Sequence, residues 1–292
     1  MLSIRSRAIA SASAGVVAAG TLTAVALTAA PADAAALTVN HARIGPHHHV
    51  HMTDVLRPGV HEIVVRSARQ ASFQIVRTHR GYSDRELAHD VNAGINGSDV
   101  KALERFERNV TLLGGVSSAP RHPGKMYVDL TRGGRYLAVD TNVRRTRAAQ
   151  LHHFRVRGAR VAGRLPSGKR ITAIDEATWA ARPKAIPTRG VLRFVNRSKD
   201  NHFIAMARLL PGKTEADFKA WVDAVMQGQD AAPPVEMSGP ELDSGVVSPG
   251  HRMAFRYHLP KGHYILTCWW PDSEMGGMPH TFMGMYRQLN VR

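Results

Sequence analysis

The chain has 292 residues, of which 43% are hydrophobic and 21% are charged, so it can bury a core and is not disordered as a whole. Its 25 glycines and 16 prolines are ordinary counts, which excludes collagen-like and low-complexity proteins. A single cysteine excludes an intrachain disulfide framework and any zinc site built on two or more thiolates.

The first 36 residues have the pattern of a secretory signal peptide. Two arginines precede an uncharged Ala/Val/Leu/Thr run over residues 8–30, and Ala32-Asp33-Ala34 supplies small residues for cleavage. The alternative interpretation is an uncleaved N-terminal anchor. No other run approaches the roughly 18 apolar residues needed to span a bilayer. The mature chain is therefore expected to be secreted, without a membrane span.

The charge of the chain is strongly positive. The formal net charge is +16, and it becomes +15 when residues 1–36, with Arg5, Arg7 and Asp33, are removed. Such a surface attracts nucleic acid, anionic cell-wall polymers or an acidic partner protein. The chain has no basic run interleaved with aromatic residues and no nucleic-acid-binding motif, so nucleic acid is not expected. We interpret the charge as a solvated surface available to an acidic redox partner or a cell-wall polymer.

The sequence repeats itself. Gly59–Ser67 lies over Gly190–Ser198 at an offset of 131, and the same offset continues without a gap into the following segment. Two further matches follow after small length changes: Gly134–Asp140 with Gly262–Cys268, and Phe154–Arg157 with Leu289–Arg292. This self-similarity predicts two homologous units, residues 37–158 and 159–292.

Each unit is predicted to consist mainly of short strands with one helix between them. In the first unit a helix is expected after Ser83, with Leu87, Val91 and Ile95 on its apolar face. In the second unit Thr214-Glu215-Ala216-Asp217 fits an N-terminal capping pattern for a helix that carries Phe218, Trp221, Val222 and Val225. Short apolar or alternating runs predict strands over residues 192–195, 203–209, 253–259 and 262–268. The pattern predicts an all-β fold of two tandem Greek-key β-sandwiches, each with one inserted short helix.

Possible metal ligands gather late in the second unit. Cys268 follows a predicted strand, and His202 stands far upstream, just before another. The loop after Cys268 adds Met275, Met278, His280, Met283 and Met285. Two imidazoles, one thiolate and a weak thioether form the donor set of a blue-copper electron-transfer centre, because imidazole suits Cu(II) while thiolate and thioether suit Cu(I).

These segments resemble a known family. Asn196–Phe203 resembles the segment that carries the first copper histidine of cupredoxins, the plastocyanin/azurin-like proteins. Gly262–Cys268, Pro271-Asp272 and Gly277–Met285 are similar to the end of a group of secreted bacterial cupredoxin-like proteins. The resemblance is specific over residues 190–292 and weaker over the first unit. It implies two cupredoxin-like domains and one mononuclear type 1 copper ion.

The resemblance also implies the ligands. His202, Cys268 and His280 would be equatorial and Met285 axial. The spacing of 12 between Cys268 and His280 is longer than in plastocyanin-like loops. Met283 competes for the axial position, but Met285 is favoured because four residues separate it from His280, as in plastocyanin.

The first unit lacks these ligands. Ala71 stands at the position of His202, and Asp140 at the position of Cys268. The first unit is therefore predicted to be a degenerate cupredoxin-like domain without a copper site. It carries another histidine cluster, His47–His51, in which His49 and His51 alternate in a manner that suits Cu(II) or Zn(II). A polar loop or edge strand near the mature N-terminus is the favoured explanation of that cluster, and the sequence alone does not show whether it binds metal.

Three functions fit these features. The first is a secreted copper protein that transfers single electrons through its second unit. The second is a multicopper oxidase or nitrite-reductase-like enzyme, which is disfavoured because such families place a histidine beside the copper cysteine, whereas Thr267 and Trp269 flank Cys268. The third is a non-redox protein, either for extracellular copper storage and delivery or a β-sandwich binding module. The sequence predicts a non-enzymatic protein and leaves its electron donor, its acceptor and its oligomeric state undetermined.

Overall fold

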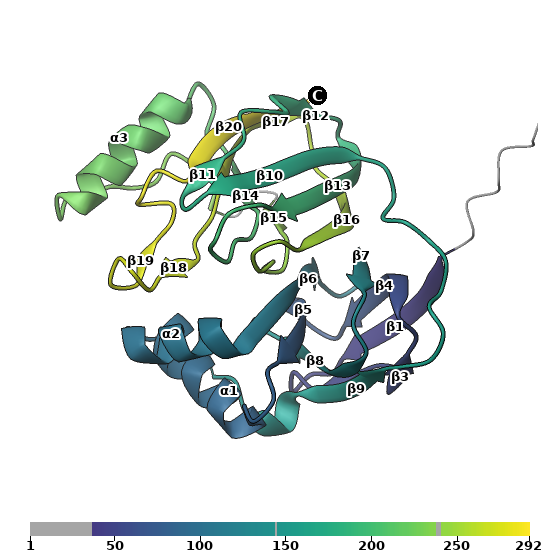
Figure 1. Cartoon of the computed structure of the whole chain (residues 1–292). Coiled ribbons are helices and arrows are strands. Elements are labelled where there is room, and N and C mark those ends of the chain that lie inside the picture. The colour runs from purple at the N-terminus through teal and green to yellow at the C-terminus, as the bar shows by residue number, and fades with distance from the viewer. Residues whose placement is uncertain (1–36, 144, 238–240) are drawn as a thin grey trace, which may run out of the picture. The chain divides into compact units, whose positions relative to one another are not determined.

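Strands dominate both halves of the chain, as predicted (Figure 1). The computed structural model describes residues 37–143, 145–237 and 241–292, so the predicted signal peptide lies outside the described residues. We call residues 37–158 the first half and residues 159–292 the second half. Strands of the first half are β1 (Thr38–Ile44), β2 (Val50–His51), β3 (Val55–Leu56), β4 (Gly59–Ser67), β5 (Ala71–Thr78), β6 (Val110–Ser118), β7 (Gly124–Leu130), β8 (Gly134–Asp140) and β9 (His152–Val156).

The second half contains the remaining strands. They are β10 (Lys169–Asp175), β11 (Thr178–Trp179), β12 (Ala185–Ile186), β13 (Arg189–Asn196), β14 (Ala205–Arg208), β15 (Glu241–Asp243), β16 (Arg252–His258), β17 (Gly262–Thr267), β18 (Pro271–Asp272), β19 (Met278–Pro279) and β20 (Tyr286–Val291). The four strands predicted from apolar runs correspond to β13, β14, β16 and β17, with ends that differ by a few residues.

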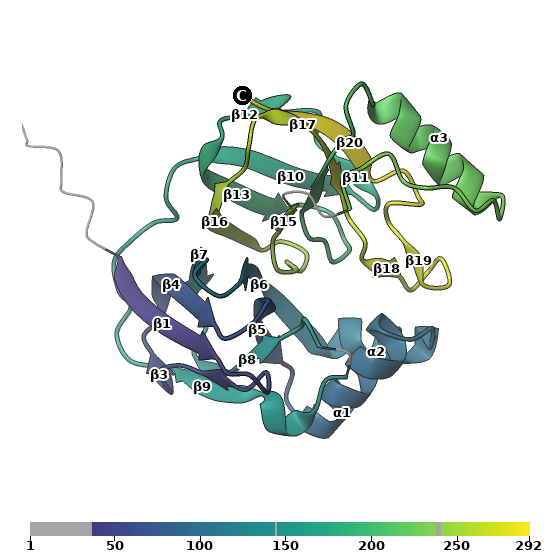
Figure 2. The ribbon, with the colours of Figure 1, turned by 180° about the vertical axis from the view of Figure 1, so that it is seen from behind.

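The strands form three large sheets. An eight-stranded sheet, in the order β11-β10-β13-β16-β7-β4-β1-β2, takes four strands from each half. The first half adds a five-stranded sheet, β3-β9-β8-β5-β6, and the second adds β12-β20-β17-β14-β15. In each half the five-stranded sheet faces that half's part of the shared sheet (Figure 1 and Figure 2). This arrangement confirms the prediction of an all-β fold made of β-sandwiches.

The two halves pair their strands in the same register. In the first half β5 and β8 pair through Gln74↔Val139, Ile75↔Ala138 and Val76↔Leu137. In the second half β14 and β17 pair through Ala205↔Thr267, Met206↔Leu266 and Ala207↔Ile265. Each first-half pair lies at the position that the sequence self-similarity assigns to its second-half counterpart. The same register makes Ala71 and Asp140 the counterparts of His202 and Cys268.

Helices connect strands in each half. The first half contains α1 (Asp84–Asp90), a π-helical turn (Val91–Ile95), α2 (Val100–Asn109) and a 3₁₀ turn (Ala148–Gln150), and the second contains α3 (Glu215–Met226). Reciprocal capping boxes begin α3 at Thr214 and α1 at Ser83, so both expected helices start where the sequence predicted. We expected one helix in the first half, and the structure adds α2, which begins at an Asp99 cap.

A continuous apolar core fills the sandwiches. In the second half Leu192 and Phe194 of β13 and Tyr264 and Leu266 of β17 are fully buried, because alternate residues of a strand point to the same face. The described residues form a compact unit, and β7 pairs directly with β16. The division into domains at residues 158 and 159 therefore remains a prediction. No helix of the described residues is long and apolar enough to span a membrane.

Candidate metal centre

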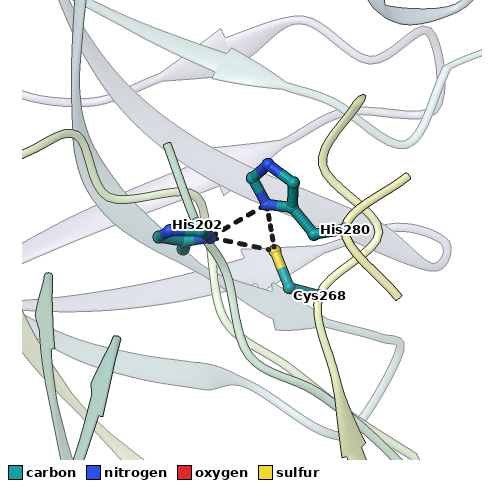
Figure 3. Close-up of side chains that lie close together, drawn as sticks. All are labelled: His202, Cys268 and His280. Atoms are coloured by element: carbon teal, nitrogen blue, oxygen red, sulfur yellow. Dashed lines mark hydrogen bonds between the residues drawn. The ribbon is translucent and has the colours of Figure 1, made fainter. Parts of the chain in front are cut away.

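His202, Cys268 and His280, which come from distant parts of the second half, bring one potential ligand atom each to a common position (Figure 3). The Sγ atom of Cys268 lies 3.5 Å from Nδ1 of His202 and 3.6 Å from Nδ1 of His280. The two Nδ1 atoms are 3.0 Å apart. All three side chains are fully buried. The sequence prediction that these residues converge is therefore fulfilled in the structure.

The size of this triangle fits a metal ion. An ion equidistant from the three atoms would lie about 2 Å from each, close to the length of metal–nitrogen and metal–sulfur bonds in proteins. Two imidazoles and one thiolate are the in-plane donors of blue-copper sites. The residues present therefore fit one copper ion.

Backbone hydrogen bonds fix each of the three residues. His202 forms an antiparallel bridge with Val247, whose N–H donates to the His202 carbonyl at 2.8 Å. The Cys268 carbonyl accepts from both the N–H and the hydroxyl of Thr281, each at 2.7 Å. The His280 N–H donates to the Trp270 carbonyl at 2.9 Å. The ligand atoms are thus held by the sandwich and its loop before any ion binds.

Two methionines follow His280, and they differ in burial. Met285 is fully buried, its N–H donates to the His280 carbonyl at 2.9 Å, and its own carbonyl accepts from Trp179 Nε1 at 3.3 Å. Met283 is partly exposed and also donates its N–H to the His280 carbonyl, at 3.0 Å. Burial in the same core as the other three residues favours Met285 as the thioether nearest the site.

Burial keeps the ligand side chains neutral when no cation is present. It raises the pKa of the Cys268 thiol to about 12. Burial, and then the nearby His280, lowers the pKa of His202 to about 3. Burial also lowers the pKa of His280, and the neighbouring Asp272 offsets part of this effect. A divalent cation binds the thiolate and not the thiol, so its binding would displace the proton of the Cys268 thiol.

The far edge of the His280 ring faces carboxylates. Its Nε2 atom lies 3.6 Å from Oδ2 of Asp272, which is buried. Asp272 is fixed in turn, because its Oδ1 accepts from the N–H groups of Glu274 and Met275. Burial, followed by the charge of Asp272, raises the pKa of Asp200 to about 6. At 3.6 Å this contact is longer than a hydrogen bond, so Asp272 acts on the His280 imidazole through its negative charge.

The corresponding position in the first half has a different chemistry. Asp140 Oδ2 lies 2.6 Å from His48 Nδ1, and Asp140 Oδ1 accepts from the N–H of Ser72 at 2.9 Å. A histidine–carboxylate pair thus occupies the place of the cysteine. Among the described residues, the two groups of three possible metal ligands both belong to the second half, and neither includes any residue of His47–His51.

Two tryptophans follow the cysteine and have different surroundings. Trp270 is buried, and its Nε1–H donates to Glu107 of α2 at 2.8 Å. Trp269 is 37% exposed and forms edge-to-face contacts with Phe282 and with Trp221 of α3. The contact between Trp270 and Glu107 is not predictable from local sequence patterns, because the two residues are 163 positions apart.

No protein-family model matches the chain. No curated protein matches it. Solved structures similar to this chain include the dithionite-reduced auracyanin of Roseiflexus castenholzii (16% identity, 44% of this chain, 98% of that one, TM-score 0.28). Others are auracyanin B (18%, 45%, 93%, 0.28) and auracyanin A, described as a "blue" copper protein, of Chloroflexus aurantiacus (16%, 44%, 99%, 0.27). Because these TM-scores lie below 0.5, the chemistry of the site has to be read from its own side chains.

Proposed function

We propose that this chain is an exported copper protein that transfers single electrons through a type 1 copper centre in its second half. His202, Cys268 and His280 would hold the copper ion, with Met285 as the fourth and weakest ligand. The observation that carries the proposal is the convergence of two Nδ1 atoms and one Sγ atom within 3.6 Å of one another, in a fully buried position.

A copper ion bound here supplies reversible one-electron chemistry between Cu(II) and Cu(I). The protein supplies a site that changes little between these two states. His202 is fixed through Val247, Cys268 through Thr281 and His280 through the Trp270 carbonyl. Complete burial of the ligands also excludes water from the coordination sphere. Because the ligand residues are fixed in this way, the site requires little structural reorganisation when an electron arrives or leaves.

Trp269 gives the centre a route to the surface. It directly follows Cys268 in the chain, and it is 37% exposed while the three ligand side chains are fully buried. Its contacts with Phe282 and Trp221 make an aromatic surface beside α3. We infer that a redox partner receives or donates electrons on this side. The formal charge of +15 on residues 37–292 favours an acidic partner protein.

The chain neighbours of Cys268 favour an electron carrier over an enzyme. Thr267 and Trp269 flank Cys268, so no histidine beside the cysteine leads to a second copper centre. Export rests on the signal-peptide pattern of residues 1–36, and the N-terminal sequence of the mature protein checks it: a mature chain that begins at about residue 37 is expected.

A copper titration of purified residues 37–292 tests the proposal. We expect one equivalent of Cu(II) to bind and to produce intense visible absorption from the copper–thiolate bond. Cys268→Ser is expected to abolish this absorption, because the hydroxyl is a poor ligand for either copper state. Met275→Leu, which removes a thioether that is 52% exposed on the same loop, is the matched control and should leave the titration unchanged.

Two results would contradict the proposal. One is a wild-type protein without intense visible absorption after copper addition. The other is a Cys268→Ser protein that binds copper with the wild-type affinity and spectrum. Binding of several exchangeable copper ions would instead indicate the copper storage or delivery function.

A further inference from the structure

The first half of the chain contacts the loop that joins Cys268 to His280 through one carboxylate. Glu107 belongs to α2 of the first half, and α2 lies close to the β18–β19 segment (Figure 1 and Figure 2). Its Oε1 accepts from the Nε1–H of Trp270 at 2.8 Å, and its Oε2 accepts from the hydroxyl of Ser273 at 2.7 Å. Both carboxylate oxygens are therefore committed to the segment that joins Cys268 to His280.

Burial of the Glu107 carboxylate at this contact disfavours its charged form. Burial raises the pKa of Glu107, the two hydrogen bonds oppose that rise, and the charge of Asp272 adds to it. Glu104, one turn earlier on α2, instead has a side chain that is 44% exposed and pairs with Arg108 at 3.5 Å. A surface glutamate of α2 can thus satisfy itself on its own helix, whereas Glu107 reaches across to the other half.

The contact leads directly to a ligand. The Trp270 ring also packs against Phe106 of α2, with ring centroids 6.0 Å apart, and the Trp270 carbonyl accepts the N–H of His280 at 2.9 Å. A shift of Trp270 would therefore move the backbone hydrogen bond that places His280. Ser273 lies next to Asp272, whose carboxylate faces the His280 ring. Glu107 thus fixes the loop at Trp270 and at Ser273. The Trp270 carbonyl accepts the His280 N–H, and Ser273 is the chain neighbour of Asp272, which faces the His280 ring.

We propose that Glu107 is a positioning residue of the copper centre, through which the first half fixes the ligand loop of the second half. This inference rests on the proposed function. In both oxidation states Glu107 would keep His280 in place, which slows the release of copper. Its negative charge also favours Cu(II) over Cu(I), so it lowers the reduction potential of the centre.

Glu107→Gln in the copper-loaded protein tests this role. We expect copper to be released about three- to tenfold faster and the reduction potential to rise; the effect is smaller than the ten- to hundredfold typical of a direct partner of a ligand, because Glu107 acts on His280 through Trp270. Glu104→Gln removes a carboxylate from the same helix and should change neither quantity. Ser273→Ala removes one hydrogen bond but keeps the charge, so it should speed copper release with little change in potential. Ser273→Ala also keeps the test open if Glu107→Gln does not fold.

Hydrogen exchange separates this inference from the proposed function. In the copper-free protein the His280 amide, which donates to Trp270, should exchange faster in Glu107→Gln than in the wild type. This measurement does not require that copper binds. Unchanged exchange across residues 268–285, together with an unchanged copper release rate and potential, would overturn the positioning role even in a protein with the expected blue spectrum.

Discussion

Met285 and Met283 are both candidates for the axial thioether, and the two residues differ in burial and in hydrogen bonding. Met285 is fully buried and is held at both its N–H and its carbonyl, whereas Met283 is partly exposed. An axial ligand adjusts the potential of a blue-copper centre without being needed for the copper–thiolate bond. The proposed role of Met285 therefore predicts a change of the reduction potential rather than a loss of copper.

We expect Met285→Leu to retain copper and its intense visible absorption and to have a higher reduction potential. A tenfold shift toward Cu(I) corresponds to about 59 mV for one electron, and we expect a rise of about that size. Cyclic voltammetry of the two single variants measures it. Met283→Leu serves as the control and should stay at the wild-type potential; a rise in Met283→Leu alone would assign the axial role to that residue.

Asp90 joins the helices of the first half and is the main buried charge among them. Its carboxylate is 2% exposed and accepts from Arg105 at 2.6 Å and from the Tyr82 hydroxyl at 2.9 Å, and it contacts His89 Nδ1 at 2.9 Å. Burial raises the pKa of Asp90, but these hydrogen bonds outweigh it and hold the pKa below the usual 3.8. The ionised form therefore stabilises the fold, and this contribution disappears as the pH falls through the lowered pKa.

Asp90→Asn should lower the free energy of unfolding by about 3 kcal/mol at neutral pH, because Arg105 and Tyr82 lose a charged acceptor. Urea unfolding at pH 7 measures this value. The difference between variant and wild type should shrink well below pH 3.8, where the wild-type carboxyl is also protonated. Glu104→Gln, which breaks an exposed pair, should cost less than about 1 kcal/mol. A pH-independent difference for Asp90→Asn would contradict the assigned cause.

Local sequence signals predicted the starts of two helices, whereas α2 was not predicted. The capping patterns at Ser83 and Thr214 predicted the starts of α1 and α3, because a cap is defined by residues three positions apart. Asp99 and the buried Leu103 and Phe106 carry a similar signal for α2, the helix that we did not predict from the sequence. Ligand convergence was predictable only because the internal repeat and the family resemblance placed the strands.

Long-range contacts could not be predicted in the same way. Trp179 lies 106 positions from the Met285 carbonyl that it contacts, and Glu107 lies 163 positions from Trp270. Nothing in the residues around Glu107 distinguishes it from Glu104, since both are glutamates on one helix. The pairing of β7 with β16 was also absent from the sequence signal, because strand alternation indicates which face is buried and not which edge finds a partner.

At the scale of the whole molecule, the two halves are joined strand to strand with local two-fold symmetry. β7 pairs antiparallel with β16 through Met126↔Phe255, Tyr127↔Ala254 and Val128↔Met253. The registers with β4 and β13 make Met126, Tyr127 and Val128 the counterparts of Met253, Ala254 and Phe255. Each strand therefore meets its own counterpart, as in an isologous dimer interface.

This symmetry predicts how the second half would behave alone. Residues 159–292 without the first half expose the β16 edge, and a second copy can cover it in the register that β7 now uses. The two-fold centre falls at Ala254, so Arg252 of one copy would lie opposite Arg256 of the other. Both arginines are exposed, and like charges placed directly opposite destabilise strand pairing.

We therefore expect residues 159–292 to form a dimer that tightens with salt, measured by sedimentation at about 0.1 M and about 1 M, where the screening length falls from about 10 to about 3 Å. Arg256→Glu replaces both repulsive pairs by attractive ones, so this variant should dimerise at low salt and weaken as salt rises. A fragment that stays monomeric at every salt concentration, with and without Arg256→Glu, would show that β16 needs the specific side chains of β7 and not merely an equivalent edge.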